Sequence, residues 1–163
     1  MTEKMEIAKS WLELLLANQV LMSGVFGWFS AQTIKTVIYA VVNKKLDLTR
    51  FVGDGGMPSA HSATVVCMTT SAAIVSGLDS PVFAVAAILC AITMRDAVGV
   101  RRVTGKQSQL LNQLIEIFAP ANELMPEQRL KEFVGHTPLQ VLLGAVLGVL
   151  MAFVLDMIYQ IRV

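Results

Sequence analysis

Four long runs without Asp, Glu, Lys or Arg constrain this chain more than any other feature. They cover residues 14–34, 55–78, 80–94 and 133–155, and contain 21, 24, 15 and 23 residues. A helix that crosses a bilayer needs about 20 mostly apolar residues. We therefore predict an all-α, polytopic membrane protein with a single integral domain over 1–163. Its transmembrane helices, about four in number, are expected at roughly 18–43, 58–78, 81–99 and 137–160.

Composition excludes several other classes of protein. Charged residues are only 15% of the chain, against about 25% in a soluble domain, and the mean hydropathy is +0.62. These values argue against a soluble enzyme, a disordered chain and a disulfide-rich secreted module. The formal net charge of +1 argues against a nucleic-acid partner. Cys67 and Cys90 lie in apolar stretches, which favours small buried residues over a disulfide or a metal pair.

The charged residues are concentrated in two long connections, 44–57 and 100–136, which four spans would place on one face. We expect a short interfacial helix at 6–17, and an amphipathic helix at 107–118 that ends before the prolines of 120–126. The loop face carries eight Lys and Arg residues and the opposite face three. The positive-inside rule therefore predicts loops in the cytoplasm, and we expect a protein of the plasma membrane.

Glycine, proline, serine and histidine gather just before the second predicted span, in the stretch GGMPSAHSA (55–63). Gly56 permits positive φ and close backbone approach, and Ser59 and His61 would lie at the start of the helix. The free N–H groups and positive dipole end of a helix start favour an anion such as phosphate. His61 adds a group that can move a proton near neutral pH. The alternative is a glycine-rich turn that only caps a membrane helix.

A second group of candidates lies at the end of the third predicted span. Arg101 and Arg102 could bind phosphate oxygens in bidentate fashion, or serve as interfacial anchors. Asp96 lies close to them, and an acid at the end of a span usually has a partner or a task. Pairing with one of the arginines would make Asp96 structural.

The other candidates are His136, Gln140 and Lys35. His136 precedes the last span, and Gln140 follows it by four residues, on the same helical face. The chain has only two histidines, and both lie at predicted cytoplasmic helix starts, which suggests a shared site. Lys35 interrupts an apolar run, so it either has a function or snorkels to the surface. The spacing of His61, His136 and Asp96 does not support a metal site, so we predict neither metal nor cofactor.

Gly144 and Gly148 form a small-xxx-small pair in the last predicted span. Such a pair allows two helices to approach closely. The contact would lie within the chain or between two chains, and the second alternative implies a homodimer.

Taken together, these motifs resemble the divergent branch of the type-2 phosphatidic acid phosphatase family, which is related to the vanadium-dependent haloperoxidases. The resemblance covers about residues 32–148 and is carried by GGMPSAHSA (55–63), DAVGVRR (96–102) and GHTPLQV (135–141). It implies a helical phosphatase core without a metal. It also implies that His136 is the nucleophile and His61 the general acid. Lys35, Ser59, Arg101, Arg102 and the backbone after Gly56 would bind the phosphate.

Three positions depart from the pattern of the wider family. Val42 stands where an Arg-Pro pair is expected after the lysine, and 33 residues (103–135) separate Arg102 from His136. Gln140 replaces the carboxylate that normally follows the nucleophile. A neutral amide orients an imidazole but does not stabilise imidazolium, and the comparable loss in a Ser-His-Asp triad costs about 10⁴ in rate. Asp96 is the acid that could take over this role by contacting His136.

The resulting prediction is a membrane phosphatase that hydrolyses a phosphorylated lipid, such as phosphatidic acid or a polyprenyl phosphate or diphosphate, through a phosphohistidine. Its site would face the cytoplasm, so that the lipid head reaches the charged pocket while the tail stays in the bilayer. The alternatives are a non-catalytic member that binds, transports or assembles phosphate lipids, which Gln140 favours, and a purely structural membrane protein. The wider family generally has six helices, so four also suggest a homodimer.

Overall fold

The computed structural model describes residues 2–53, 56–118, 130 and 135–161, and within this part of the chain every regular element is a helix. The order is α1 (Thr2–Ala17), α2 (Gln19–Asn43), a 3₁₀ turn η1 (Leu48–Phe51), α3 (Ala60–Ser76), α4 (Pro81–Val98), α5 (Val100–Phe118) and α6 (Pro138–Ile161). The all-helical prediction is confirmed. Helices α2, α3, α4 and α6 begin and end within two residues of the four predicted ranges.

Among the residues that the structure describes, three helical segments are long and apolar enough to cross a membrane: α2, the continuous helical segment Pro81–Phe118 formed by α4 and α5, and α6. Helix α3 is also apolar but has 17 residues, so it is about 25 Å long at 1.5 Å per residue. A hydrocarbon core is about 30 Å thick. The protein is thus a helical membrane protein, and a crossing by all four helices stays a prediction.

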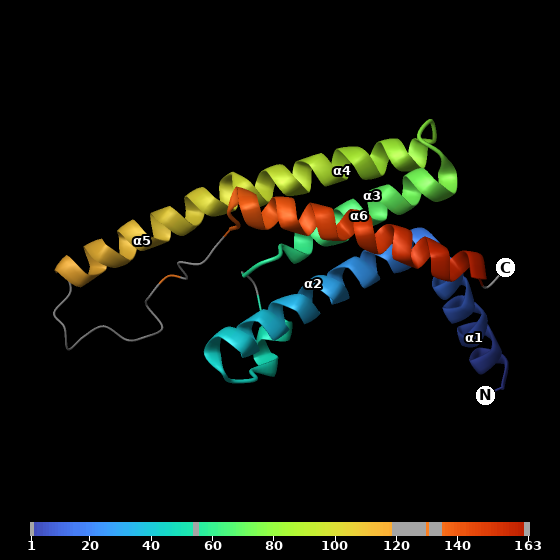
Figure 1. The fold of residues 1–163 in the computed structure, drawn as a ribbon, viewed down its shortest axis with the longest axis horizontal. Helices are drawn as coiled ribbons and strands as arrows, with labels where there is room; N and C mark the ends of the chain where they lie inside the picture. Colours follow the sequence, from blue (N-terminus) through green and yellow to red (C-terminus); the bar gives the residue numbers. More distant parts are fainter. Residues whose placement is uncertain (1, 54–55, 119–129, 131–134, 162–163) are drawn as a thin grey trace.

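Helix α3 lies at the centre and contacts α2, α4 and α6 (Figure 1). The helices approach closely because small residues meet there. A Cβ on Gly27 would lie 2.8 Å from the Ala63 carbonyl oxygen, and one on Gly148 would lie 2.7 Å from the same atom. The Ala63 carbonyl is therefore enclosed by α2 and α6. Gly144 and Gly148 both pack on α3 of their own chain, so their spacing serves contacts within the chain. The spacing of these two glycines is thus no longer an argument for a homodimer through this face.

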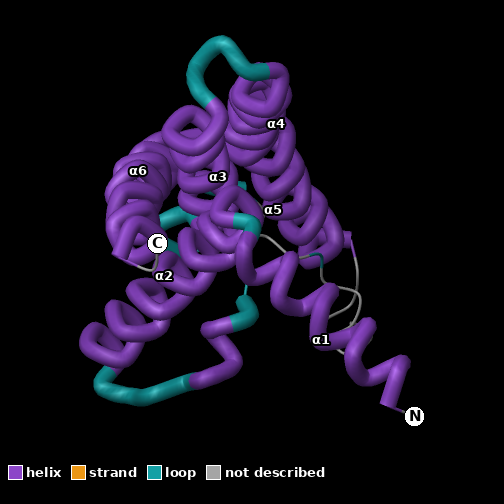
Figure 2. The backbone as a smooth tube through the Cα atoms, turned by 90° about the vertical axis from the view of Figure 1, so that its right-hand side faces the viewer, coloured by secondary structure: helices purple, strands orange, loops and turns teal. Residues whose placement is uncertain are grey.

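Leu, Ile and Val side chains point outward along the bundle, as expected for a surface that faces lipid. Polar contacts also join the helices, two of them at the end of the bundle opposite the candidate residues. Gln19 Nε2 donates to Asp156 Oδ1 at 2.8 Å, and the Tyr159 hydroxyl donates to the Leu16 carbonyl. Both bonds lie where α1, α2 and α6 meet, far from the starts of α3 and α6. Helix α1 includes the range 6–17 predicted as an interfacial helix, and it diverges from the bundle (Figure 2).

The region predicted as a long loop, 100–136, begins instead with a helix. Gly99 N donates to the Arg95 carbonyl at 2.8 Å, and Val103 N donates to the Gly99 carbonyl at 3.1 Å. The hydrogen-bond ladder thus passes through Gly99, and α5 extends almost in line with α4 beyond the bundle (Figure 1). The prediction was wrong for 100–106 because a polar helix and a polar loop have the same composition. Residues 119–129 and 131–134 lie outside the described residues.

The other connection, 44–57, is not all irregular, because η1 lies within it. The Phe51 ring packs edge-on against Trp28 and Phe29, with centroid distances of 5.7 and 5.5 Å. This aromatic cluster ties the connection to α2. Since α2 ends, α3 begins, α4 ends and α6 begins at the same end of the bundle, every candidate residue is placed at that end.

Candidate functional site

A cavity of about 380 Å³ opens at this end, between α2, α3, α4 and the start of α6. It brings together three of the predicted site residues, Lys35, His61 and His136. The remaining lining residues are Trp28, Gln32, Val52, Ala60, Thr64, Val65 and Thr93. A few convergent polar groups in a mostly apolar cavity are typical of a small-molecule site.

The two histidines face each other in this cavity, with ring centroids 6.0 Å apart. His61 lies in the first turn of α3 and is exposed, whereas His136 precedes α6 and is buried. They are 75 positions apart in the sequence. The expectation that both histidines belong to one site therefore matches their placement, and both imidazoles can reach one bound group.

His136 is held by its backbone and by its ring. Its N–H donates to the Ala97 carbonyl at 3.0 Å, which fixes it to the end of α4. Gln140 Oε1 accepts from Thr137 N at 2.9 Å and lies 3.3 Å from His136 Nδ1. Because this oxygen is an acceptor, Nδ1 must be the donor in that contact. The neutral ring then carries its lone pair on Nε2.

Gln140 also closes a capping box with Thr137. Thr137 Oγ1 accepts from Gln140 N at 3.3 Å, while the Gln140 side chain accepts from Thr137 N. This reciprocal pair satisfies two N–H groups at the start of α6, and Pro138 follows in the first helical position. The pattern T-P-L-Q signals this cap in the sequence, and our sequence reasoning missed it. Gln140 thus serves the helix and the histidine with one oxygen.

Ser59 differs from the expected phosphate donor. It is the N-cap of α3, fully buried, and its Oγ lies 3.4 Å from Ser62 N and 3.1 Å from Ser62 Oγ. Its backbone N–H donates to the Gln140 carbonyl at 3.0 Å, which links the two helix starts. A Cβ on Gly144 would collide with the Ser59 carbonyl oxygen. Ser59 therefore does not line the cavity but supports the two helix starts that form it.

Lys35 and Gln32 lie one turn apart on α2, and both are buried, with exposures of 8% and 4%. The stem of Lys35 runs beside Gly56, where a Cβ would lie 3.1 Å from Lys35 Cγ. Gly56 has φ of +84°, so the turn requires glycine for both conformation and space. The Gln32 Oε1 atom has no hydrogen-bond partner within the described chain. A buried amide oxygen of this kind needs a hydrogen-bond donor, and a molecule bound in the cavity can supply it.

Arg101, Arg102 and Asp96 lie outside the cavity lining. Arg101 Nε donates to Asp96 Oδ2 at 2.7 Å, and both side chains are about half exposed. The backbone of Arg101 and Arg102 packs against Gly135, so these residues support the segment that carries His136. The structure does not bring Asp96 to His136; Gln140 is the side chain that meets the ring. The suggestion that Asp96 replaces the missing carboxylate therefore lacks its contact.

Trp28 and Thr93 are among the lining residues that sequence reasoning did not single out. Trp28, Gln32 and Lys35 have the 4 and 3 spacing of one helical face, so the lysine could have pointed to Trp28. Thr93 on α4 carried no signal that separates it from other threonines. Among the described residues, no three His, Cys, Asp or Glu side chains come together as a metal site would require.

The fold and the cavity define a class: a helical membrane protein with two histidines and a lysine at one end of its bundle. Residues 16–151 match the divergent PAP2 family, so the chain belongs to that family. It is 41% identical over 151 residues to the "uncharacterized membrane protein YuiD" of Bacillus subtilis (strain 168). That match covers 86% of this chain and 96% of the relative. No solved structure matches the chain.

Proposed function

We propose that this protein is a membrane phosphatase that hydrolyses a phosphorylated lipid through a phosphohistidine on His136. The observation that carries the proposal is the pairing of His61 and His136 across one cavity that also contains Lys35. Membership of a PAP2-related family agrees with a phosphatase-related role. Phosphatidic acid and polyprenyl phosphates or diphosphates are the candidate substrates.

In the proposed first step, His136 Nε2 attacks phosphorus and the bond from phosphorus to the lipid oxygen breaks. His61 donates a proton to that oxygen, and the lipid leaves as an alcohol (or as a monophosphate from a diphosphate). In the second step, water attacks the phosphohistidine while His61 accepts its proton. The bond from Nε2 to phosphorus then breaks and inorganic phosphate is released.

The side chains around the histidines suit this chemistry. The Lys35 ammonium stabilises negative charge on the transferring phosphoryl group in a cavity with apolar walls. Gln140 holds Nδ1 as the donor, which directs the lone pair on Nε2 to the reaction. The Gln32 amide offers a further polar contact to the bound head group.

We also propose that the site faces the cytoplasm. The cavity lies at the end of the bundle where Lys44, Lys45, Arg101, Arg102 and Lys106 follow the apolar segments, and the positive-inside rule assigns such an end to the cytoplasm. This place at the bilayer surface lets a lipid head enter while its tail stays in the membrane.

A second candidate function is a phosphate-lipid binder without turnover. Gln140 favours it, because the side chain 3.3 Å from the His136 ring is neutral and cannot stabilise an imidazolium. The cavity and Lys35 would still bind a phosphorylated lipid.

The test is phosphate release by detergent-purified protein over a panel of phosphatidic acid, polyprenyl phosphate and polyprenyl diphosphate. A His136→Ala variant is run beside the wild type, and thermal unfolding shows that both are folded. We expect release from at least one lipid that disappears in the variant, and a ³²P-labelled intermediate that acid removes and base does not. If the wild-type protein is folded and binds these lipids but releases no phosphate, the second candidate function, a phosphate-lipid binder, is favoured.

A further inference from the structure

A second cavity, of about 300 Å³, lies beside the first between α2 and α3. Its walls are formed by Leu21, Gly24, Val25, Trp28, Thr64 and Met68. The one hydroxyl among them, Thr64 Oγ1, donates to the Ala60 carbonyl at 2.8 Å. With this donor satisfied, the groove presents an apolar surface.

This apolar groove adjoins the histidine cavity, because Trp28 and Thr64 line both. On α2 the cavity side is formed by Trp28, Gln32 and Lys35, and the groove side runs from Trp28 back to Leu21. The seven residue steps from Trp28 to Leu21 correspond to about 10 Å along the helix axis. The groove therefore leads away from the charged end and along the apolar part of the bundle.

Gly24 lets the Met68 side chain of α3 pack directly against α2. A Cβ at this position would lie 2.7 Å from both Cγ and Sδ of Met68. Met68 packs against the bare backbone, and its flexible thioether side chain can adapt to an apolar occupant.

We propose that the groove holds a hydrocarbon chain of the same lipid whose phosphate occupies the histidine cavity. The identity of the head group rests on the function proposed above, and the chain is assigned to the groove because the two cavities share the walls formed by Trp28 and Thr64. Since the chain leaves hydrocarbon rather than water, the groove gains little from the hydrophobic effect. It acts by positioning: a seated chain holds the ester oxygen between the two histidines. The substrate class is thus a phosphate ester whose chain begins close to the phosphate.

The kinetic test fills the groove with Val25→Phe. Val25 lines the groove and is 52% exposed, so a larger side chain can be added without a buried collision. The matched control is Val146→Phe on α6, which is 51% exposed and lies in the wall of neither cavity. Each protein is assayed on an 18-carbon monoacylglycerol phosphate and on phenyl phosphate, which has no long chain.

We expect Val25→Phe to lower the ratio of kcat/KM for the long-chain ester over phenyl phosphate about tenfold, the size of effect that one pocket contact gives. Val146→Phe should keep the wild-type ratio. An unchanged ratio in Val25→Phe, or the same fall in both variants, overturns the proposal.

A binding measurement separates this inference from the phosphatase proposal. Trp28 lies where the two cavities join, and Trp11→Phe leaves it as the only tryptophan. In vesicles, phosphatidic acid with brominated chains should quench Trp28 more than brominated phosphatidylcholine at equal content. Val25→Phe should remove the excess. Equal quenching by both lipids means that bulk lipid fills the groove and overturns the inference. Excess quenching without phosphate release supports the groove and rejects the phosphatase.

Discussion

The starts of α3 and α6 carry one histidine each, and they hold it in opposite ways. At α3 the cap is Ser59, whose hydroxyl bonds within its own helix, and within the described residues no side chain hydrogen-bonds to His61. At α6 the cap includes Gln140, whose oxygen also meets the His136 ring. A nucleophile benefits from a fixed ring and a defined tautomer, whereas a general acid must gain and lose its proton. The difference supports the proposed roles, in which His136 attacks phosphorus and His61 transfers the proton.

The largest expected effect comes from exchanging the leaving group in variants of the two histidines. His136→Ala should abolish turnover of both lipid phosphate and p-nitrophenyl phosphate, because no nucleophile remains. His61→Ala should slow the lipid ester about 10²–10⁴-fold. It should slow p-nitrophenyl phosphate much less, since nitrophenolate leaves without a proton. Steady-state kcat for the two esters provides the measurement.

The same pair of variants can break the comparison. Equal losses on both esters in His61→Ala would mean that His61 binds or attacks phosphate rather than protonating the leaving group. A p-nitrophenyl activity that survives in His136→Ala would remove the nucleophile from α6.

An intermediate effect is expected from Gln140. Gln140→Leu removes the acceptor for Thr137 N and for His136 Nδ1, so we expect kcat to fall at least about tenfold, or ~1.4 kcal/mol in the barrier. Loss of half the capping box should also lower the unfolding free energy by about 1 kcal/mol. Gln140→Glu retains both contacts and adds the carboxylate that stabilises imidazolium, so its kcat should equal or exceed that of the wild type.

Thr137→Val is the matched control, because it removes the other half of the capping box and leaves the contact of Gln140 with His136. We expect a similar loss of unfolding free energy and nearly wild-type kcat. If Thr137→Val and Gln140→Leu reduce kcat equally, Gln140 acts only as a helix cap.

Much of the fold could be predicted because a bilayer makes strict demands on a sequence. Charge-free runs located α2, α3, α4 and α6, since a charge within a span is costly. The start of α5 could not be found in this way. Its first turns, 100–106, are polar, and only the backbone bonds through Gly99 show that the helix continues. Likewise, the spacing of Gly144 and Gly148 predicted close packing but could not identify α3 as the partner.

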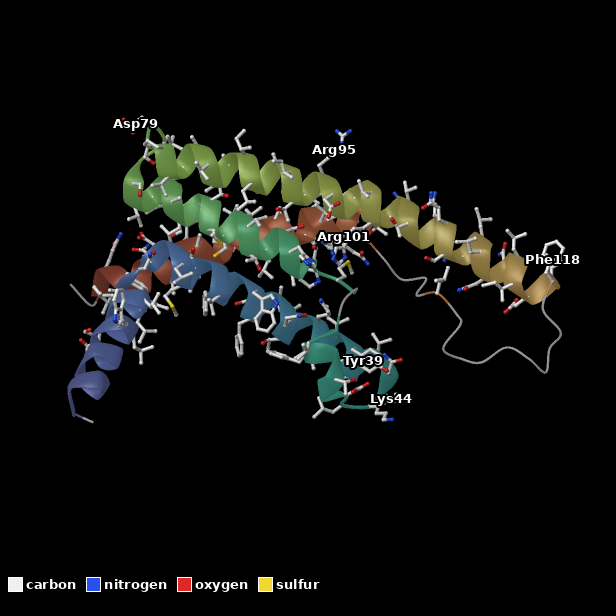
Figure 3. All side chains as sticks on the ribbon, turned by 180° about the vertical axis from the view of Figure 1, so that it is seen from behind. Tyr39, Lys44, Asp79, Arg95, Arg101 and Phe118 are labelled. Carbon is white, nitrogen blue, oxygen red and sulfur yellow. The ribbon has the colours of Figure 1, made fainter. Side chains whose placement is uncertain are left out.

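The grouping of candidate residues could be predicted where a residue type has few roles at its position in the chain. Two histidines at two helix starts, and a lysine in an apolar run, pointed to one site, and the cavity contains all three. The roles of Ser59 and Arg101 were not predictable, because a serine at a helix start either caps or binds. The direction of Arg101 on its helix depends on how α5 continues from α4. Figure 3 shows Arg101 at that junction, away from the end of α2 marked by Tyr39 and Lys44.

The smallest effect is expected from substitution of Asp96. The result shows whether His136, at the start of α6, depends on a carboxylate for activity. The side chains of Arg101 and Asp96 are 51% and 40% exposed, and exposed ion pairs contribute about 0–1 kcal/mol to stability. Asp96→Asn should therefore change the unfolding free energy by less than about 1 kcal/mol and leave kcat within about twofold. Arg101→Gln removes the same pair from the other side and should give the same small changes.

A large fall of kcat in Asp96→Asn, with Arg101→Gln close to wild type, would mean that Asp96 reaches His136 during turnover. Equal and small effects would favour Gln140 over Asp96 as a side chain that orients the proposed nucleophile, whereas within the described residues no side chain hydrogen-bonds to His61.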